Sequence, residues 1–196
     1  MAYILLGLCA HLALALFEWA SLRGMAALKV IMAVLVLLIS VVSHTAIGLS
    51  PRKFTLSSGL SVLGWAMAVM FACLWLYSMF GEIPFAKTYL GAGHGDRLVT
   101  TGTYALCRHP TVLWYGMILC GLLLATRSID LLVAAPIWLA ADALYVWAEE
   151  KLFLRRMFAD YEQYQRQTPM LLPTGGSVRC WLRTMNNQQR RTGGVG

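Results

Sequence analysis

Two pairs of charged or titratable residues stand at the borders of apolar segments in the second half of the chain. The pairs are Arg108-His109 and Glu149-Glu150, and a further acid, Asp142, lies inside the apolar stretch before the second pair. Such groups are costly beside hydrocarbon, so they are candidate functional residues. Arginine binds carboxylates and glutamate binds ammonium groups, which suits a zwitterionic ligand. From the residues alone, simple salt bridges within the set are the favoured interpretation.

The surroundings of these groups follow from the composition. Of 196 residues, 59% are hydrophobic and 13% are charged, against roughly a quarter charged in an ordinary soluble domain. No Lys, Arg, Asp or Glu occurs between Lys29 and Arg52 or between Lys53 and Glu82. Each gap is long enough for a helix to cross a hydrocarbon core of roughly 30 Å. The sequence therefore predicts an all-α integral membrane protein whose partner is the lipid bilayer.

Five apolar segments are the predicted membrane helices. They are residues 2–19, 30–49, 60–80, 111–126 and 129–148. Only Arg127 and Ser128 separate the last two, which predicts a tight antiparallel helical hairpin. The hairpin brings the start of the fourth segment beside the end of the fifth, and so brings the two charged pairs together. Asp142, Tyr145 and Glu149 share one face of the fifth helix by their spacing.

The basic residues predict the orientation in the membrane. With the C-terminus in the cytoplasm, 13 of the 16 Lys and Arg residues lie inside, and only Arg52, Lys53 and Arg127 lie outside. We therefore expect an outside N-terminus and a cytoplasmic C-terminus. The first segment has no basic residue before it, which favours a retained helix over a cleaved signal peptide.

The chain divides into three predicted parts. Residues 1–80 hold three membrane helices, and residues 81–173 hold a cytoplasmic loop, the helical hairpin and a terminal helix that together form the site. In the loop, the glycines of residues 91–95 predict a hinge or lid. Apolar residues from Leu152 to Tyr164 recur at helical spacing, so we expect the fifth helix to continue to about Thr168. Residues 174–196 are glycine-rich and basic and are expected to form a mobile tail.

Several short motifs follow one another in the second of these parts. They are residues 98–104 (LVTTGTY), residues 108–110 (RHP), Glu149-Glu150, residues 158–164 (FADYEQY) and residues 169–173 (PMLLP). In this order and spacing the chain resembles the isoprenylcysteine carboxyl methyltransferase and phospholipid N-methyltransferase superfamily of integral-membrane enzymes. The resemblance implies a methyltransferase that uses S-adenosylmethionine at the cytoplasmic face. Gly102 would permit the turn before the fourth helix, and Pro110 would begin that helix.

The resemblance also implies roles for individual residues. Arg108 and His109 would meet the methionine carboxylate of the cofactor, and Glu149 or Glu150 its ammonium. Tyr104 and residues 170–173 would help to enclose it. The implied cofactor-binding residues are Tyr104, Arg108, His109, Glu149, Glu150, Leu172 and Pro173.

The candidate catalytic residues are Arg108, Glu149 and Asp142. An ammonium acceptor needs a general base, which Asp142 or Glu149 would supply, whereas a carboxylate or thiolate acceptor needs none. The expected acceptor is lipophilic or membrane-partitioned: an isoprenylcysteine-like carboxylate, a phospholipid amine or a small thiol. Residues 111–114 (TVLW) depart from the pattern of many relatives, so the resemblance does not choose among these.

Two other functions remain open. One is a membrane reductase, because some membrane reductases share parts of the pattern. The other is a non-enzymatic membrane component, in which the two charged pairs would contact only one another. The five cysteines form no metal-ligand or disulfide pattern, and packing is the expected role of Cys107. We expect no metal and no nucleic-acid partner, and the sequence is silent on oligomeric state.

Overall fold

The computed structural model describes residues 1–83 and 98–192, with side chains up to residue 184. The elements are α1 (Ala2–Leu22), α2 (Ala26–Gly48), α3 (Ser58–Leu76), η1 (Tyr77–Glu82), η3 (Gly102–Ala105), α4 (Pro110–Thr126), α5 (Ile129–Glu149), η4 (Glu150–Leu154), α6 (Arg155–Met157), α7 (Tyr161–Gln167) and α8 (Gly175–Thr192). Within the described part, the regular structure is helical apart from an isolated bridge between Lys53 and Ser128. The predicted all-α fold is confirmed.

Four helical stretches are long and apolar enough to cross a membrane, namely Ala2–Leu22, Ala26–Gly48, Ser58–Glu82 and Ile129–Met157. The fifth predicted segment forms α4, which is apolar but has only 17 residues. About five membrane helices are therefore present, as predicted. The glycines of residues 91–95, predicted to form a hinge or lid, lie outside the described residues.

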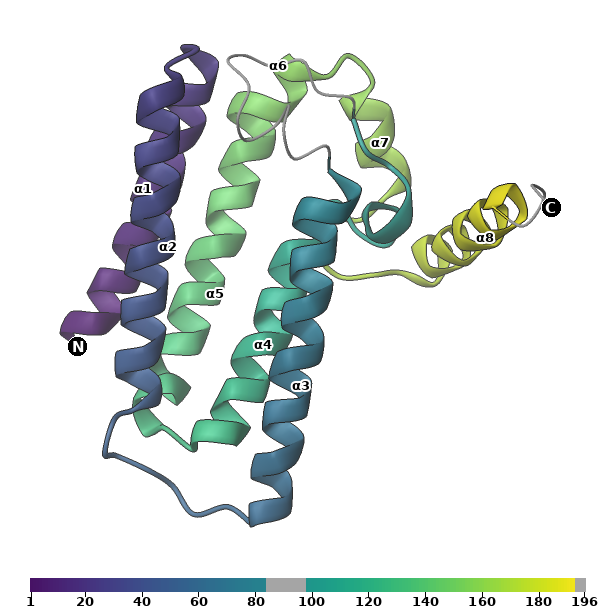
Figure 1. The fold of residues 1–196 in the computed structure, drawn as a ribbon. Helices are drawn as coiled ribbons and strands as arrows, with labels where there is room; N and C mark the ends of the chain where they lie inside the picture. The colour runs from purple at the N-terminus through teal and green to yellow at the C-terminus, as the bar shows by residue number, and fades with distance from the viewer. Residues whose placement is uncertain (84–97, 193–196) are drawn as a thin grey trace.

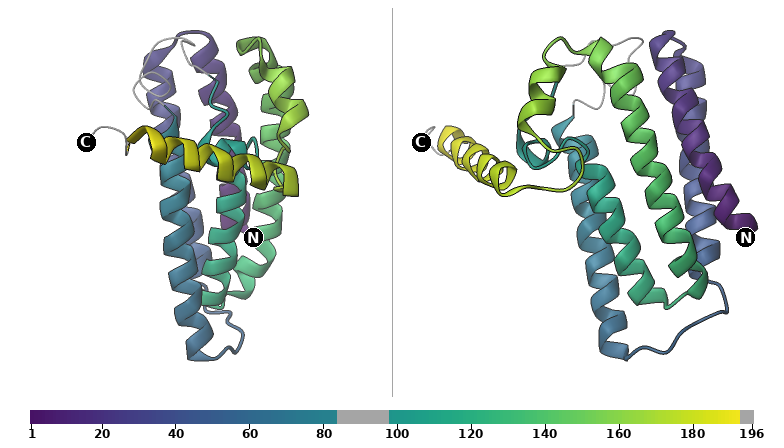
Figure 2. Two further views of the ribbon diagram at one scale, coloured as in Figure 1. Left: turned by 90° about the vertical axis from the view of Figure 1, so that its right-hand side faces the viewer. Right: turned by 180° about the vertical axis from the view of Figure 1, so that it is seen from behind.

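The membrane helices form two tightly packed pairs with α5 between them (Figure 1). α1 packs along α2 on one side and α3 packs along α4 on the other, while α5 contacts α1, α2 and α4. The view from behind shows the same order (Figure 2). Because α5 lies in the middle, side chains from both pairs can reach it, and α5 carries Asp142, Glu149 and, where η4 begins, Glu150.

Small residues allow α3 and α4 to approach closely. A Cβ on Gly64 would lie 2.5 Å from the Ala125 nitrogen, and one on Gly121 would lie 2.7 Å from the Ala68 nitrogen. Gly64-Ala68 and Gly121-Ala125 are each four residues apart, the small-residue spacing by which membrane helices pack backbone to backbone. This close packing holds the start of α4, and with it Arg108-His109, against the end of α3.

The predicted hairpin of α4 and α5 is present, and its turn is stabilised by hydrogen bonds from another part of the chain. Arg127 adopts a left-handed conformation with φ 56°, and the Ser128 hydroxyl accepts from the Leu131 backbone to cap α5. The connection between α2 and α3 pairs with this turn, because Phe54 N donates to Arg127 O and Ile129 N donates to Arg52 O. These contacts lie at the opposite end of the bundle from Glu149-Glu150 (Figure 1).

The prediction of one continuous terminal helix was wrong. α5 continues through η4 and α6 to Met157, but Phe158 is extended, with φ −121° and ψ 115°. The chain turns there and α7 folds back toward the bundle. The break has a physical reason, since it lets Gln165 and Thr168 reach Arg108.

Residues 174–196, predicted to form a mobile tail, contain the helix α8. Thr174 and Ser177 begin it, because each side-chain oxygen accepts from the backbone nitrogen of the other. Such reciprocal capping satisfies two backbone donors at a helix start. α8 contacts η3 and runs crosswise to the membrane helices (Figure 2).

Candidate functional site

The centre of the candidate site is the Glu150 carboxylate, 5% exposed at the end of α5. Arg108 donates to both of its oxygens, from Nε at 2.7 Å and from Nη2 at 2.9 Å. His109 Nε2 lies 2.9 Å from Oε1, and Gln165 Nε2 donates to Oε2 at 2.7 Å. A carboxylate can only accept in these contacts, so the proton lies on His109 Nε2. We call these four residues, Arg108, His109, Glu150 and Gln165, the Glu150 hub.

The C-terminal strap, residues 168–173, is joined to the hub through the backbone. Arg108 N donates to Pro169 O at 2.9 Å and His109 N donates to Met170 O at 3.1 Å. Arg108 Nη1 donates to the carbonyls of Thr168 and Gln165. All three guanidinium nitrogens of Arg108 are therefore engaged within the protein, and Arg108 holds the strap and α5 together.

Three residues in or near the hub have pKa values above their ordinary range. Burial alone would lower the pKa of Arg108, but its contacts with the Glu150 carboxylate raise that pKa above its ordinary value. Burial and the charge of Glu150 raise the pKa of Tyr161 well above its usual range. Burial raises the pKa of the Cys107 thiol to about 12. Cys107 is thus a neutral, fully buried side chain, as its predicted packing role requires.

Glu149, next to the hub residue Glu150, has a different environment. Its Oε2 lies 4.0 Å from His109 Nδ1, and within the described residues it accepts no hydrogen bond. It lies close enough to Glu18, Asp142 and Glu150 for their charges to interact. We call these four acids, Glu18, Asp142, Glu149 and Glu150, the carboxylate row.

The carboxylate row lies where α1 meets α5. From α1, His11 Nε2 lies 3.8 Å from Asp142 Oδ1, and Glu18 interacts electrostatically with Lys29 of α2. Lys29 is 2% exposed. Among the described residues, the permanent cations beside the row are Lys29 and Arg108, against four acids. A carboxylate in this position favours a cation, because an uncompensated charge at membrane depth is costly.

A profile of the phospholipid methyltransferase family matches residues 60–161. The match covers just over half of the chain, from α3 to the start of α7, and leaves Gln165 of the hub outside it. The chain belongs to the phospholipid methyltransferase family. The Arg108-His109 and Glu149-Glu150 pairs all lie inside the matched region.

Two curated relatives are similar over a shorter stretch. The nickel-cobalt-cadmium resistance protein NccN of Alcaligenes xylosoxydans xylosoxydans is 37% identical over 87 residues, covering 43% of this chain and 40% of the relative. The cobalt-zinc-cadmium resistance protein CzcN of Cupriavidus metallidurans is 36% identical over 87 residues, covering 43% and 39%. The aligned part is thus about two fifths of either relative. No solved structure matches the chain.

The structure brings together four of the residues predicted for the family site, Arg108, His109, Glu149 and Glu150. Asp142 shares the face of Glu149 but lies two helical turns away, beside His11 of α1. The alternative of mutual pairing describes Arg108, His109 and Glu150 closely, whereas Glu149 contacts His109 only at 4.0 Å. Within the described residues, no group of three or more His, Cys, Asp or Glu side chains is arranged to hold a metal ion.

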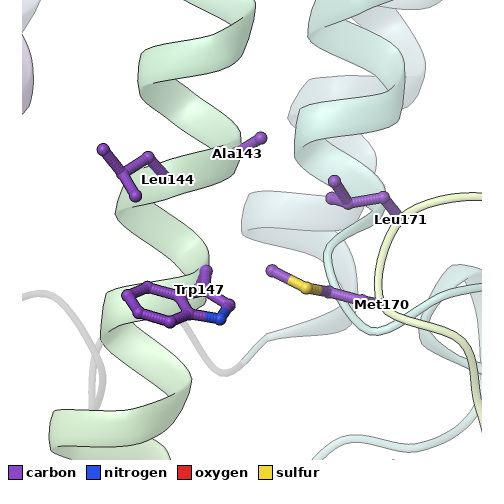
Figure 3. A pocket seen from close by; sticks show the side chains of 5 residues that line it. All are labelled: Ala143, Leu144, Trp147, Met170 and Leu171. Atoms are coloured by element: carbon purple, nitrogen blue, oxygen red, sulfur yellow. The ribbon is translucent and has the colours of Figure 1, made fainter.

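Three other predicted residues lie apart from the hub. The Tyr104 hydroxyl donates to Ser78 O at 3.4 Å, and its carbonyl accepts from the Tyr164 hydroxyl at 2.6 Å. Tyr104 therefore packs between η1 and α7. Leu172 is 75% exposed and Pro173 is also exposed, on the outside of the strap. Met170 and Leu171 are the strap residues that turn toward α5 (Figure 3).

Sequence reasoning missed Gln165 in the hub and the position of His11 and Glu18 opposite α5. Gln165 carried a usable signal, since it lies one helical turn after Tyr161 and so shares its face. His11 and Glu18 are seven residues apart on one face of α1. That spacing indicated a shared neighbour but not which helix supplied it.

A second buried polar cluster links the end of α3 to the turn before α4. Glu82 accepts from the Thr103 backbone nitrogen at 2.9 Å and from the Thr103 hydroxyl. That hydroxyl also contacts Ser78 Oγ, which accepts from Trp114 Nε1 at 2.9 Å. Gly102 is left-handed here, with φ 62°, and a Cβ on it would lie 1.8 Å from Glu82 Oε1. Its predicted role in this turn is confirmed.

Gly102→Ala is expected to lower the free energy of unfolding by about 2 kcal/mol, because alanine strains a left-handed residue and displaces Glu82 from Thr103. Thermal unfolding of the protein in nanodiscs measures this. Gly59→Ala, at an open position with no atom within 4 Å of the added Cβ, is the matched control. Equal melting temperatures for the two variants would contradict the role of Gly102.

An apolar groove of about 420 Å³ lies between α5 and the strap. Its lining residues are Ala143, Leu144, Trp147, Met170 and Leu171 (Figure 3). Ala143, Trp147 and Glu150 are spaced by four and three residues, so they share one face of α5. Leu144 and Trp147 are exposed at 64% and 47% on a helix that crosses the membrane. The groove is thus a lipid-accessible surface that leads along α5 toward the Glu150 hub.

Proposed function

We propose that this protein transfers a methyl group from S-adenosylmethionine to a lipophilic, membrane-partitioned acceptor at the end of the bundle formed by the Glu150 hub. Membership of the phospholipid methyltransferase family supports methyl transfer as the reaction class. The observation that carries the cofactor assignment is Glu149, a half-buried carboxylate that accepts no hydrogen bond within the described residues. It lies beside the hub and in a row with three other acids.

The residues fit the charge of this cofactor. S-adenosylmethionine carries a sulfonium and an ammonium against one carboxylate, so its net charge is positive. Glu149 offers a carboxylate to the ammonium, and the other acids of the row favour a net cation beside it. The buried Tyr161 hydroxyl lies near the Glu150 carboxylate and Arg108, and in this proposal it donates to the ligand carboxylate. His109, held by Glu150 on one ring nitrogen, presents the other toward Glu149.

In this proposal Arg108 is a positioning residue. Its guanidinium fixes Glu150 and the strap carbonyls, which sets the position of His109 and the shape of the site. When bound, the cofactor supplies a methyl group already activated by the sulfonium. The protein then has to hold the acceptor in line and exclude water. Burial of the hub beneath the strap excludes water.

The acceptor is proposed to be lipophilic because the groove is apolar and faces lipid. An acyl or prenyl chain lying along Ala143 and Trp147 would bring its polar end to the hub. If that end is an amine, Glu149 or Asp142 is the candidate base, because these are the acids of the carboxylate row that α5 carries outside the hub. The metal-resistance names belong to relatives that align over about two fifths of their length, and no metal chemistry is proposed for this chain.

Calorimetry tests the cofactor assignment directly. The full chain in nanodiscs should bind S-adenosylhomocysteine, the product form of the cofactor, and His109→Ala should weaken that binding. Binding of the reduced nicotinamide cofactor NADPH in its place would favour the reductase alternative. Absence of binding to either compound would favour a non-enzymatic component and would overturn the proposal.

Ala143→Trp is expected to reduce methylation of lipid acceptors strongly while leaving S-adenosylhomocysteine binding within about twofold, because the indole fills the groove without touching the hub. Transfer of tritiated methyl from the cofactor into a total membrane lipid extract measures the first effect. Leu132→Trp, at a 54% exposed position elsewhere on α5, is the matched control. Equal activity of the two variants would contradict an acceptor site in the groove.

A further inference from the structure

We propose that α8 is a membrane-surface helix that docks on anionic phospholipid headgroups beside the entrance of α4. Docking of α8 requires only that the chain spans a bilayer, so it is independent of methyl transfer. The first support is charge. Residues 174–196 contain four arginines and no acidic residue, and basic segments next to membrane spans are attracted to anionic lipid surfaces.

The position of α8 in the fold is the second support. α8 contacts η3, which precedes the first residue of α4 by only a few residues. It therefore lies at the level where a membrane helix begins. It also runs crosswise to the spans and extends away from the bundle (Figure 2). A helix in this place and direction lies along the bilayer surface.

The described side chains of α8 are arranged for an interface. Ser177 is 2% exposed and Trp181 is half-buried, so this side of the helix meets the protein. Val178 and Leu182, one turn apart, are exposed at 36% and 51%. Exposed apolar side chains on a helix at bilayer level fit the acyl boundary, as in other interfacial amphipathic helices.

The arginines lie next to this apolar edge. Arg179 and Arg183 are one helical turn apart and exposed, so they share a face. Between them the small residues Gly176 and Cys180 leave a shallow concavity of about 310 Å³. Two guanidinium groups around such a concavity suit a phosphate, because arginine binds phosphate oxygens with paired N–H donors. A lipid headgroup supplies that phosphate at this level.

Hydrogen–deuterium exchange of the full chain in nanodiscs tests the docking. Amides of residues 175–184 should exchange more slowly in phosphatidylcholine containing phosphatidylglycerol than in phosphatidylcholine alone, by about fivefold per arginine. The double variant Arg179→Gln, Arg183→Gln should lose most of this difference. The double variant Arg155→Gln, Arg156→Gln, which removes the same charge from α6, should keep it.

Leu182→Asn separates insertion from charge attraction. It should speed exchange by about tenfold in both lipids, because an exposed leucine that enters the acyl boundary loses its apolar burial. Equal exchange in the two lipids for the unaltered chain would overturn the proposal. So would loss of the lipid effect in the α6 control, or slowing in phosphatidylcholine nanodiscs on addition of RNA or DNA.

Discussion

Glu150→Gln is expected to lower the free energy of unfolding by about 3–5 kcal/mol, because it leaves the buried Arg108 guanidinium without its counter-charge. Glu150 accepts from Arg108, His109 and Gln165, and glutamine offers a single neutral oxygen in its place. The strap should loosen as well, since Arg108 holds Thr168. Thermal unfolding in nanodiscs measures the loss of stability, and calorimetry should show weaker S-adenosylhomocysteine binding.

An ion pair at the opposite end of the bundle supplies the control. Asp130 accepts from Arg52 at 2.8 Å, but the Arg52 side chain is 67% exposed, and exposed pairs contribute only about 0–1 kcal/mol. Asp130→Asn should therefore cost much less than Glu150→Gln. The double variant Arg108→Met, Glu150→Gln should be more stable than the sum of the single losses predicts. Strict additivity of the two losses would contradict a direct interaction between Arg108 and Glu150.

Glu149→Gln is expected to weaken ligand binding without lowering the stability of the fold. It should weaken S-adenosylhomocysteine binding by about tenfold or more, since a hydrogen bond to a charged group contributes about 1.5–3 kcal/mol. It should leave the melting temperature unchanged or raise it. Glu149 accepts no hydrogen bond in the described residues, and its loss relieves repulsion with Glu18, Asp142 and Glu150.

Asp142→Asn is the matched control for Glu149→Gln. It removes one charge from the same carboxylate row, but beside His11 and two turns from the hub. It should leave binding of the product almost unchanged. If both substitutions weaken binding equally, only the total charge of the row matters. If Glu149→Gln destabilises the fold as much as Glu150→Gln does, Glu149 is a structural residue and the cofactor assignment fails.

Much of the fold could be predicted from the sequence, because the bilayer imposes simple constraints. Charge-free stretches of sufficient length have to be helices, so the all-α class and about five membrane segments followed from composition and charge spacing. The hairpin of α4 and α5 followed from the two-residue connection at Arg127-Ser128. That hairpin alone placed Arg108-His109 beside Glu149-Glu150. Ordered motifs around these residues indicated the family that the profile match confirms.

The terminal part of the chain could not be predicted in the same way. Apolar spacing from Leu152 to Tyr164 suits one long helix, and it contains no proline or glycine to end it. The break at Phe158 depends on contacts far away in sequence, because Gln165 and Thr168 bind Arg108 only if α7 folds back. The strap could not be predicted for the same reason, because its hydrogen bonds join Pro169 and Met170 to the start of α4.

The sequence by itself determined that two acids and two basic groups meet at one end of a membrane bundle. It did not distinguish Glu149 from Glu150. Neighbouring residues on a helix point about 100° apart, so only one of them can face Arg108. The rotation of α5 decides which one, and packing against α1, α2 and α4 sets that rotation. The tertiary structure therefore placed Glu150 in the hub, and left Glu149 facing α1 in the carboxylate row.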